Sequence, residues 1–221
     1  MPVETKKQAQ IYEQLSGIGG ALANPHRLKM LQLLTHGERT IDELGQLTEQ
    51  SLAATSAHVK SLKASHLVST EKRGRSTFCY LSDARVLELW LRLRDLGEII
   101  VPEIREIMRE DFDADTGLSP LTPNDLNTRL KRGRFILLDL RPGAEFEKGH
   151  LPRARNIPFD TLETACEHLP RKTPLLVYCR GPFCAAAMEG NQRLRDQSFN
   201  SLRLRFSVPE WRAAGLPVEE N

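Results

Sequence analysis

The residues best suited to covalent chemistry lie in one short segment, Cys179–Arg180–Gly181–Pro182–Phe183–Cys184. An apolar run, 175–178, precedes it, and an alanine-rich segment typical of a helix begins at Ala185. In a loop between a strand and a helix N-terminus, backbone N–H groups and the helix dipole favour an anion on the first loop residue. We therefore expect a lowered pKa and a nucleophilic thiolate at Cys179, with Arg180 adding positive charge. The alternative is an inert buried thiol.

The elements around this loop have the pattern of an α/β domain. A second apolar run, 135–140, contains Asp139 and is followed by Arg141, and short apolar runs alternate with helical segments from residue 122 onward. This alternation predicts a central, mostly parallel sheet covered by helices. Thr122 and Pro123 are typical of the cap and first residue of the helix that opens the domain.

A second set of candidate functional residues lies between 51 and 75, where five basic residues and one acidic residue give a net charge of +4. Thr40 and Glu43 form a capping box for a short helix, and Ser51 caps the next helix. Leu52, Thr55, Val59 and Leu62 give that second helix an apolar face. The arrangement predicts a helix-turn-helix that places its second helix in the major groove. The residues that we expect to contact DNA from this helix are Ser51, Thr55, Ser56, His58, Lys60 and Lys63.

A basic hairpin follows directly. Two strand-like runs, 67–71 and 76–81, flank the turn Lys72–Arg73–Gly74–Arg75, whose three cations can lie along a phosphate backbone. A solvated charged hairpin is the alternative. Its position after the helix-turn-helix favours DNA binding.

The helix predicted over 83–108 carries apolar residues at nearly heptad spacing, with Pro102 expected to kink or restart it. The stripe comprises Val86, Trp90, Leu93, Leu96, Ile100, Ile104 and Ile107. It would suit an intramolecular core, but we favour a homodimer interface, because a two-fold dimer matches palindromic operator DNA.

Residues 20–108 resemble the ArsR family of winged-helix repressors, through Asn24–Pro25–His26–Arg27, the segment 56–62 and Arg73–Gly74–Arg75. The resemblance implies a mainly α, winged helix-turn-helix domain that binds double-stranded operator DNA. Many relatives sense metals through paired cysteines in the helix before the turn. The corresponding segment here, 40–47, has neither cysteine nor histidine, so we predict no metal site.

Residues 122–219 resemble a rhodanese (sulfurtransferase) domain, through Asp139–Leu140–Arg141 with Glu145, the segments 149–154 and 156–158, Tyr178–Cys179 and the segment 209–218. The resemblance implies that Cys179 takes a sulfane sulfur from a small donor and passes it, as a persulfide, to an acceptor thiol or cyanide. The implied site residues are Cys179, Arg180, Gly181, Pro182, Phe183 and Cys184, with Asp139 and Arg141. Backbone N–H groups of residues 180–184 would stabilise the persulfide anion.

This sequence departs from that family at two places. Many active loops carry arginine or a hydroxyl residue five positions after the nucleophile, where this chain has Cys184. Arg180 could replace the missing anion ligand. Cys184 could resolve the persulfide into a disulfide or polysulfide, or simply pack under the helix. Arg205–Phe206–Ser207 also stands where a glycine pair is expected, which would alter the rim of the pocket.

Length and composition set the remaining limits. The chain has 221 residues, a net charge of +2, four cysteines and no apolar run approaching a membrane span. We expect a cytoplasmic protein without a cofactor, divided into a DNA-binding and dimerisation domain (1–110), an acidic linker (111–121) and a rhodanese-like domain (122–221).

Three functions fit this organisation. The first is a repressor-type transcriptional regulator in which a persulfide on Cys179 links sulfur chemistry to transcription. The second is a sulfurtransferase with an autoregulatory DNA-binding domain. The third is a regulator whose rhodanese module is catalytically silent and binds a ligand or partner.

Overall fold

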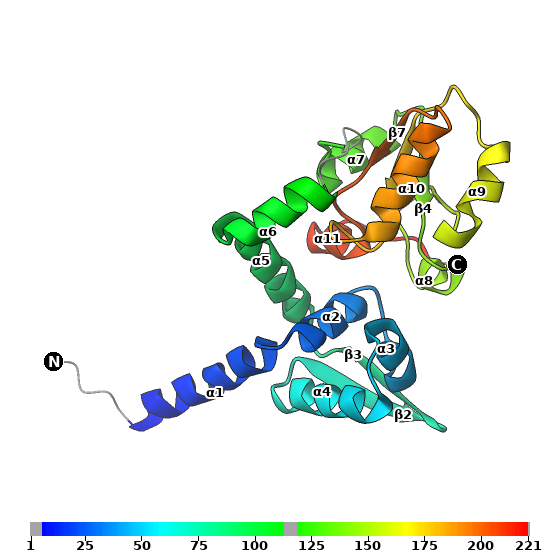
Figure 1. Cartoon of the computed structure of the whole chain (residues 1–221). Helices are drawn as coiled ribbons and strands as arrows, with labels where there is room; N and C mark the ends of the chain where they lie inside the picture. The colour runs from blue at the N-terminus through cyan, green and yellow to red at the C-terminus, as the bar shows by residue number, and fades with distance from the viewer. Residues whose placement is uncertain (1–5, 113–118, 221) are drawn as a thin grey trace. The chain divides into compact units, whose positions relative to one another are not determined.

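The computed structural model describes residues 6–112 and 119–220, and the chain forms two compact units, Met1–Trp90 and Leu91–Asn221 (Figure 1). The predicted linker, 111–121, falls largely on residues 113–118, which lie outside the described residues. The domain limits proposed from the sequence therefore stay predictions. No helix in the described part of the chain combines the length and apolarity that crossing a membrane requires.

The first unit is a winged helix-turn-helix, as predicted. A three-stranded antiparallel sheet of order β1-β3-β2 packs beside its helices. The helices are α1 (Lys6–Leu22), α2 (Pro25–Leu34), α3 (Ile41–Thr48), α4 (Leu52–Ala64) and the start of α5 (Ala84–Ile100). The strands are β1 (Arg39–Thr40), β2 (Val68–Arg73) and β3 (Ser76–Leu81).

Side-chain caps fix the starts of these helices. Asn24 accepts a hydrogen bond from the backbone N–H of Arg27 at the start of α2, and Ser51 accepts one from Ala54 at the start of α4. Thr40 and Glu43 form the predicted capping box of α3. Each cap satisfies N–H groups that have no partner inside the helix and is worth about 1 kcal/mol.

The core of the first unit lies between the helices and the sheet. Met30, Leu44, Leu62 and Cys79 are completely buried there. Burying each large apolar side chain contributes roughly 1.5–3 kcal/mol. The predicted apolar face of α4 is correct except for Leu52, whose side chain is 57% exposed because it lies in the first turn, beyond the edge of this core.

Helix α5 ends at Ile100, and α6 (Pro102–Ile107) starts at the proline, as expected for a residue that lacks an N–H group. A turn of π-helix, η1 (Met108–Phe112), follows. The apolar stripe divides in two. Val86 and Trp90 are buried, whereas Leu96, Ile100 and Ile107 are each at least half exposed.

The second unit contains a four-stranded parallel sheet of order β5-β4-β6-β7, which confirms the predicted α/β fold. Its strands are β4 (Ile136–Asp139), β5 (Ala154–Asn156), β6 (Leu175–Tyr178) and β7 (Ser201–Arg203). Its helices are α7 (Pro123–Leu130), α8 (Gly143–Glu147), η2 (Phe159–Thr161), α9 (Leu162–Ala165), η3 (Cys166–His168), α10 (Ala185–Asp196) and α11 (Val208–Ala213).

Apolar residues cover both faces of this sheet, and β4 and β6 are accordingly apolar up to their last residues, Asp139 and Tyr178. Leu138 and Val177 face a core that includes Leu194 of α10, while Leu137 and Leu176 face a core that includes Trp211 of α11. Gly190 lets α10 approach the sheet closely, because an added Cβ would lie only 2.5 Å from Leu140 Cδ1. This packing fixes the start of α10 beside the end of β6.

Candidate functional sites

The cysteine loop joins the carboxyl end of β6 to the N-terminus of α10, as predicted. Cys179 directly follows the strand, Cys184 directly precedes the helix, and Gly181 adopts a φ of 105° that side-chain-bearing residues rarely reach. Ligands of open parallel sheets bind outside the carboxyl ends of the strands. The fold therefore places Cys179 where a small molecule is expected.

A pocket of about 400 Å³ opens onto Cys179. Most of its wall is apolar, and the polar groups are Asp160, Thr161 and Arg180. The apolar wall comes from the end of β4, the start of α8, the segment around η2 and the start of α10: Leu140, Pro142, Gly143, Pro158, Phe159 and Ala186. Cys179 is only 3% exposed, so the pocket is its route to a reactant.

The two thiols of the loop interact, and the charge resides on Cys184. The thiol of Cys179 donates a hydrogen bond to the sulfur of Cys184; this bond, together with burial, raises the pKa of Cys179. The same hydrogen bond, reinforced by the backbone amides of Arg180 and Ala187, lowers the pKa of Cys184 to about 6. The expectation of a lowered pKa at Cys179 is therefore wrong. The anion-binding geometry acts on Cys184, at the start of α10.

Arg180 is held by a carboxylate rather than standing unpaired beside the thiols. Its Nη2 lies 2.5 Å from Glu145 Oε1, and its Nε lies 3.2 Å from both carboxylate oxygens. Glu145, on α8, is only 5% exposed. Glu145 belongs to a motif seen in the sequence, but nothing in the sequence indicated this ion pair. The pair compensates the positive charge of Arg180, which we expected to serve a bound anion.

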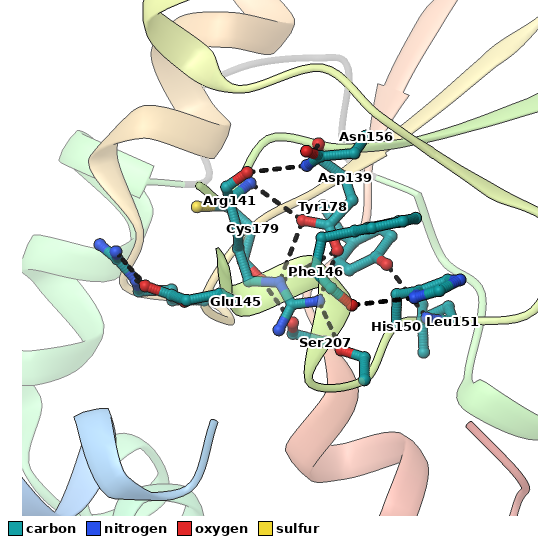
Figure 2. A network of polar contacts seen from close by, with 12 residues as sticks. Asp139, Arg141, Glu145, Phe146, His150, Leu151, Asn156, Tyr178, Cys179 and Ser207 are labelled. Carbon is teal, nitrogen blue, oxygen red and sulfur yellow. Dashed lines mark hydrogen bonds and ion pairs between the residues drawn. The ribbon is translucent and has the colours of Figure 1, made fainter. Parts of the chain in front are cut away.

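Ser207 anchors the backbone of the loop. Its hydroxyl donates a hydrogen bond to the carbonyl oxygen of Cys179 (Figure 2). Its own N–H donates to Glu210 Oε2 at 2.8 Å. Ser207, which stands where a glycine pair was expected, thus attaches the loop to the start of α11. The N–H of Cys184 is also engaged, since it donates to the carbonyl of Gly181 at 3.2 Å, so it is not directed at a persulfide on Cys179.

Asp139 and Arg141 form a buried ion pair at the end of β4 (Figure 2). Both side chains are 0% exposed, and Arg141 Nη2 also donates to the carbonyl of Gly149 at 2.8 Å. Asn156 donates to the backbone carbonyls of both residues. Neither charged side chain is among the residues that line the pocket on Cys179, and a catalytic role for them stays a prediction. They hold the loops around the site in place.

The N-terminal candidates lie mainly on the exposed side of α4. Ser51, Ser56, Lys60 and Lys63 are exposed, and Lys63 Nζ donates to Thr70 Oγ1 of β2 at 2.7 Å. Thr55 is a correction, because it is 0% exposed and its hydroxyl donates to the carbonyl of Ser51. It supports the helix from inside and cannot contact a base.

His58 is partly buried and stacks on His26 of α2, with ring centroids 5.6 Å apart. Burial, followed by the nearby Arg27 and His26, lowers the pKa of His58, so the ring is neutral at physiological pH. It can offer a hydrogen bond but no charge to DNA. The sequence spacing of these two histidines gave no sign of the pair. Among the described residues, no three His, Cys, Asp or Glu side chains gather as a metal site would require.

The wing forms as predicted, with β2 extending to Arg73 and Gly74 taking a φ of 60° in the turn. Lys72 and Arg75 are exposed at its tip. Arg73 instead forms ion pairs with Glu71 at 2.6 Å and Glu38 at 2.8 Å. These pairs are solvent-exposed and therefore weak, so a phosphate can compete for this guanidinium.

Comparisons with known proteins agree with both halves of the structure. A profile described as "Rhodanese-like domain" matches residues 122–214. The "HTH-type transcriptional regulator Rv0324" of Mycobacterium tuberculosis is 30% identical over 100% of this chain and 96% of its own length. A "Sulfurtransferase" of Allochromatium vinosum is 27% identical over 38% of this chain and 77% of its own length.

Among solved structures, a homodimeric winged helix-turn-helix DNA-binding domain from Mycobacterium bovis, a possible ArsR-family regulator, is 26% identical. It covers 47% of this chain and 95% of its own, with a TM-score of 0.43. The similarity to the M. tuberculosis regulator spans both halves of the chain.

Proposed function

The chain belongs to the ArsR-type HTH transcriptional regulators that carry a C-terminal rhodanese-like domain, and we propose that a persulfide on Cys179 links sulfur chemistry to its binding of operator DNA. The observation that carries the proposal is the presence in one chain of two sites: an exposed basic helix and wing, and a cysteine opening into a pocket. A regulator that does not respond to sulfur compounds would not need the cysteine and its pocket.

DNA binding is supported by the chemistry of the first unit. The small exposed side chains Ser51 and Ser56 at the start of α4 allow close approach to base edges, and Lys60 and Lys63 follow on the same helix. Lys72 and Arg75 extend from the wing toward a neighbouring phosphate backbone. Thr55, which is buried, is not among the DNA contacts that we propose.

A homodimer is supported by the divided stripe of α5 and α6. The first two residues of the stripe stabilise the first unit, whereas Leu96, Ile100 and Ile107 remain exposed apolar surface. Such surface on a helix is typical of an interface. We propose that the region 83–108 pairs with its copy in a second subunit, which would present two α4 helices to a two-fold DNA site.

The sulfur step that we propose is a transfer between thiols. The sulfur of Cys179 attacks the sulfane sulfur of a donor in the pocket while the thiolate of Cys184 accepts the proton of the Cys179 thiol. The new S–S bond forms as the donor's bond to that sulfur breaks, and the rest of the donor leaves with the electron pair. Cys184 then lies beside the persulfide and can resolve it. The donor and the acceptor are small molecules or thiols from solution.

The decisive experiment compares DNA affinity before and after treatment with an inorganic polysulfide. An operator is first selected from a random DNA pool with the reduced protein, and binding is then measured by fluorescence anisotropy for wild type, Cys179→Ser and Cys166→Ala. We expect affinity to change for wild type and for Cys166→Ala, whose thiol lies outside the cysteine loop, but not for Cys179→Ser. Equal affinity of treated and untreated wild type would exclude a sulfur-sensing role.

Sulfurtransferase activity is the second candidate, and the pocket on Cys179 favours it over a silent module. Turnover of thiosulfate or a persulfide with cyanide as acceptor measures it directly. Activity of wild type above that of Cys179→Ser would establish an enzyme. No difference between them would leave the regulatory function as the one to pursue.

A further inference from the structure

The pocket above Cys179 has room for more than the sulfur atom that would be transferred. Its volume of about 400 Å³ lies within the range of small-molecule sites, ~300–1,000 Å³. Leu140, Phe159 and Ala186 supply apolar wall next to the thiol. An apolar wall of this size favours a donor with an organic substituent, because a small oxyanion would leave that surface uncovered.

The charges around the pocket do not suit a dianion. Arg180 is the only cation among the lining residues, and the buried carboxylate of Glu145 already compensates it at 2.5 Å. Asp160 places a further carboxylate on the lining. Asp139, beneath the loop, is paired with Arg141.

One further cation beside the pocket is also paired. Arg193 lies over the ring of Phe159, 4.8 Å from its centroid, and pairs with Glu189 at 2.6 Å. The thiol pair itself carries a negative charge at neutral pH, because the pKa of Cys184 is lowered to about 6. The N-terminus of α10 and the loop amides supply only partial positive charge, and Cys184 already uses part of it.

We propose that the sulfur donor of this protein is an organic persulfide, whose substituent occupies the apolar pocket, and that thiosulfate is a poor donor. The inference rests on the proposed function of Cys179 as persulfide carrier. In the reaction, the Cys179 thiolate attacks the terminal sulfur of R–S–SH. A new S–S bond forms on Cys179, the S–S bond of the donor breaks, and R–S⁻ leaves with the electron pair. The products are Cys179–S–SH and a thiolate, with no external oxidant.

The test measures how fast full-length protein gains sulfur from each donor. Reduced protein is mixed anaerobically with 2-hydroxyethyl persulfide or with thiosulfate, and intact mass is followed for the added sulfur on Cys179 or a Cys179–Cys184 disulfide formed from it. Each rate is divided by the rate of the same donor with free cysteine, which removes intrinsic reactivity. We expect the organic persulfide to exceed thiosulfate by at least about tenfold, equivalent to ~1.4 kcal/mol.

Two variants separate electrostatics from pocket shape. Glu145→Gln removes the carboxylate that pairs with Arg180, and Asp160→Asn removes the carboxylate on the lining; Asp160 is exposed, so this variant is not expected to affect folding. We expect each to accelerate loading by thiosulfate several-fold relative to loading by the persulfide, and about tenfold for Glu145→Gln. Glu147→Gln, an exposed change on the same helix, is the control and should change neither.

The outcomes are distinct. Normalised loading by thiosulfate equal to that by the persulfide would overturn the inference while leaving the proposed function intact. Faster loading by the persulfide, with loading by thiosulfate unchanged in both charge variants, would overturn its electrostatic basis. Failure of both donors to load wild type would overturn the proposed function itself, and this inference with it.

Discussion

Replacing Cys179 with alanine tests which of the two loop thiols carries the negative charge. In wild type, the hydrogen bond from Cys179 is the largest cause of the lowered pKa of Cys184, which falls from an ordinary 9.0 to about 6. At ~1.4 kcal/mol for each pH unit, this lowering corresponds to about 4 kcal/mol of preferential stabilisation of the thiolate. Cys179→Ala removes the donor, so we expect the pKa of Cys184 to rise substantially toward 9.

Serine at position 179 provides a graded comparison. Its hydroxyl can still donate a hydrogen bond to Cys184, so the pKa of Cys184 should lie between the wild-type value and that of Cys179→Ala. The backbone amides of Arg180 and Ala187 contribute in all three proteins and keep the value below that of a free thiol. Cys166→Ala is the matched control, because Cys166 lies outside the loop, on η3, and should leave the titration unchanged.

The assay is alkylation by iodoacetamide, read for each cysteine by peptide mass spectrometry between about pH 4 and about pH 10. In wild type, the rate at Cys184 should reach half its plateau near pH 6, while Cys179 remains unreactive throughout the neutral range. A low midpoint at Cys179 with an ordinary one at Cys184 would refute the assignment. So would a Cys184 midpoint that is the same in wild type and in Cys179→Ala.

Protein stability should follow the same ionisation. Because the pKa of Cys184 is lowered by folding, its contribution is fully present above the ordinary value of 9.0 and is lost as the pH falls through about 6. The pKa of Cys179 is raised by folding, so its contribution to stability has the opposite pH dependence. That contribution is present below pH 9.0 and is lost as the pH rises above this value. The free energy of unfolding of wild type relative to Cys184→Ser should therefore increase from about pH 6 to about pH 9.

Three further predictions concern other parts of the chain. Asp139→Asn should lower the free energy of unfolding by ~3–5 kcal/mol in urea titrations, because it leaves Arg141 charged and fully buried, whereas exposed Asp160→Asn should change it little. Gly181→Ala should slow persulfide loading and destabilise the fold by ~1–3 kcal/mol, because φ at this position is 105°; an unchanged loading rate would show that the loop conformation is not needed for reaction. Lys60→Ala should weaken DNA binding and reduce the slope of log affinity against log salt by about 1, whereas Thr55→Val, at a buried position, should leave that slope unchanged in anisotropy titrations.

The local elements could be predicted because their signals are short-range. Caps at Asn24, Thr40 and Ser51, and prolines at the starts of α2, α6 and α7, act within one turn of the helix that they open. The alternation of short apolar runs with helices likewise required the parallel sheet of the second unit. These features follow from residues close together in the sequence.

The partners of the charged residues could not be predicted, because they come from distant segments. Glu145 meets Arg180 from 35 residues away, and Ser207 reaches Cys179 from 28 residues away. Thr55 shows a different limit. It belongs to the helix expected to contact DNA, and only its packing reveals that it faces the core.

These distant partners determine the chemistry of the cysteine loop. A cysteine directly after a strand, at a strand-to-helix turn, is expected to ionise readily. In this structure the cysteine with the lowered pKa is instead Cys184, five residues later, which directly precedes α10. Cys179 is protonated and lines the pocket, whereas Cys184 is the thiolate that can accept the proton of Cys179. Because the nucleophile and its base are both thiols, loading Cys179 also brings the persulfide next to a thiolate able to attack it. The proximity of Cys184 therefore limits how long a persulfide can persist on Cys179, and Cys184→Ser should lengthen its lifetime.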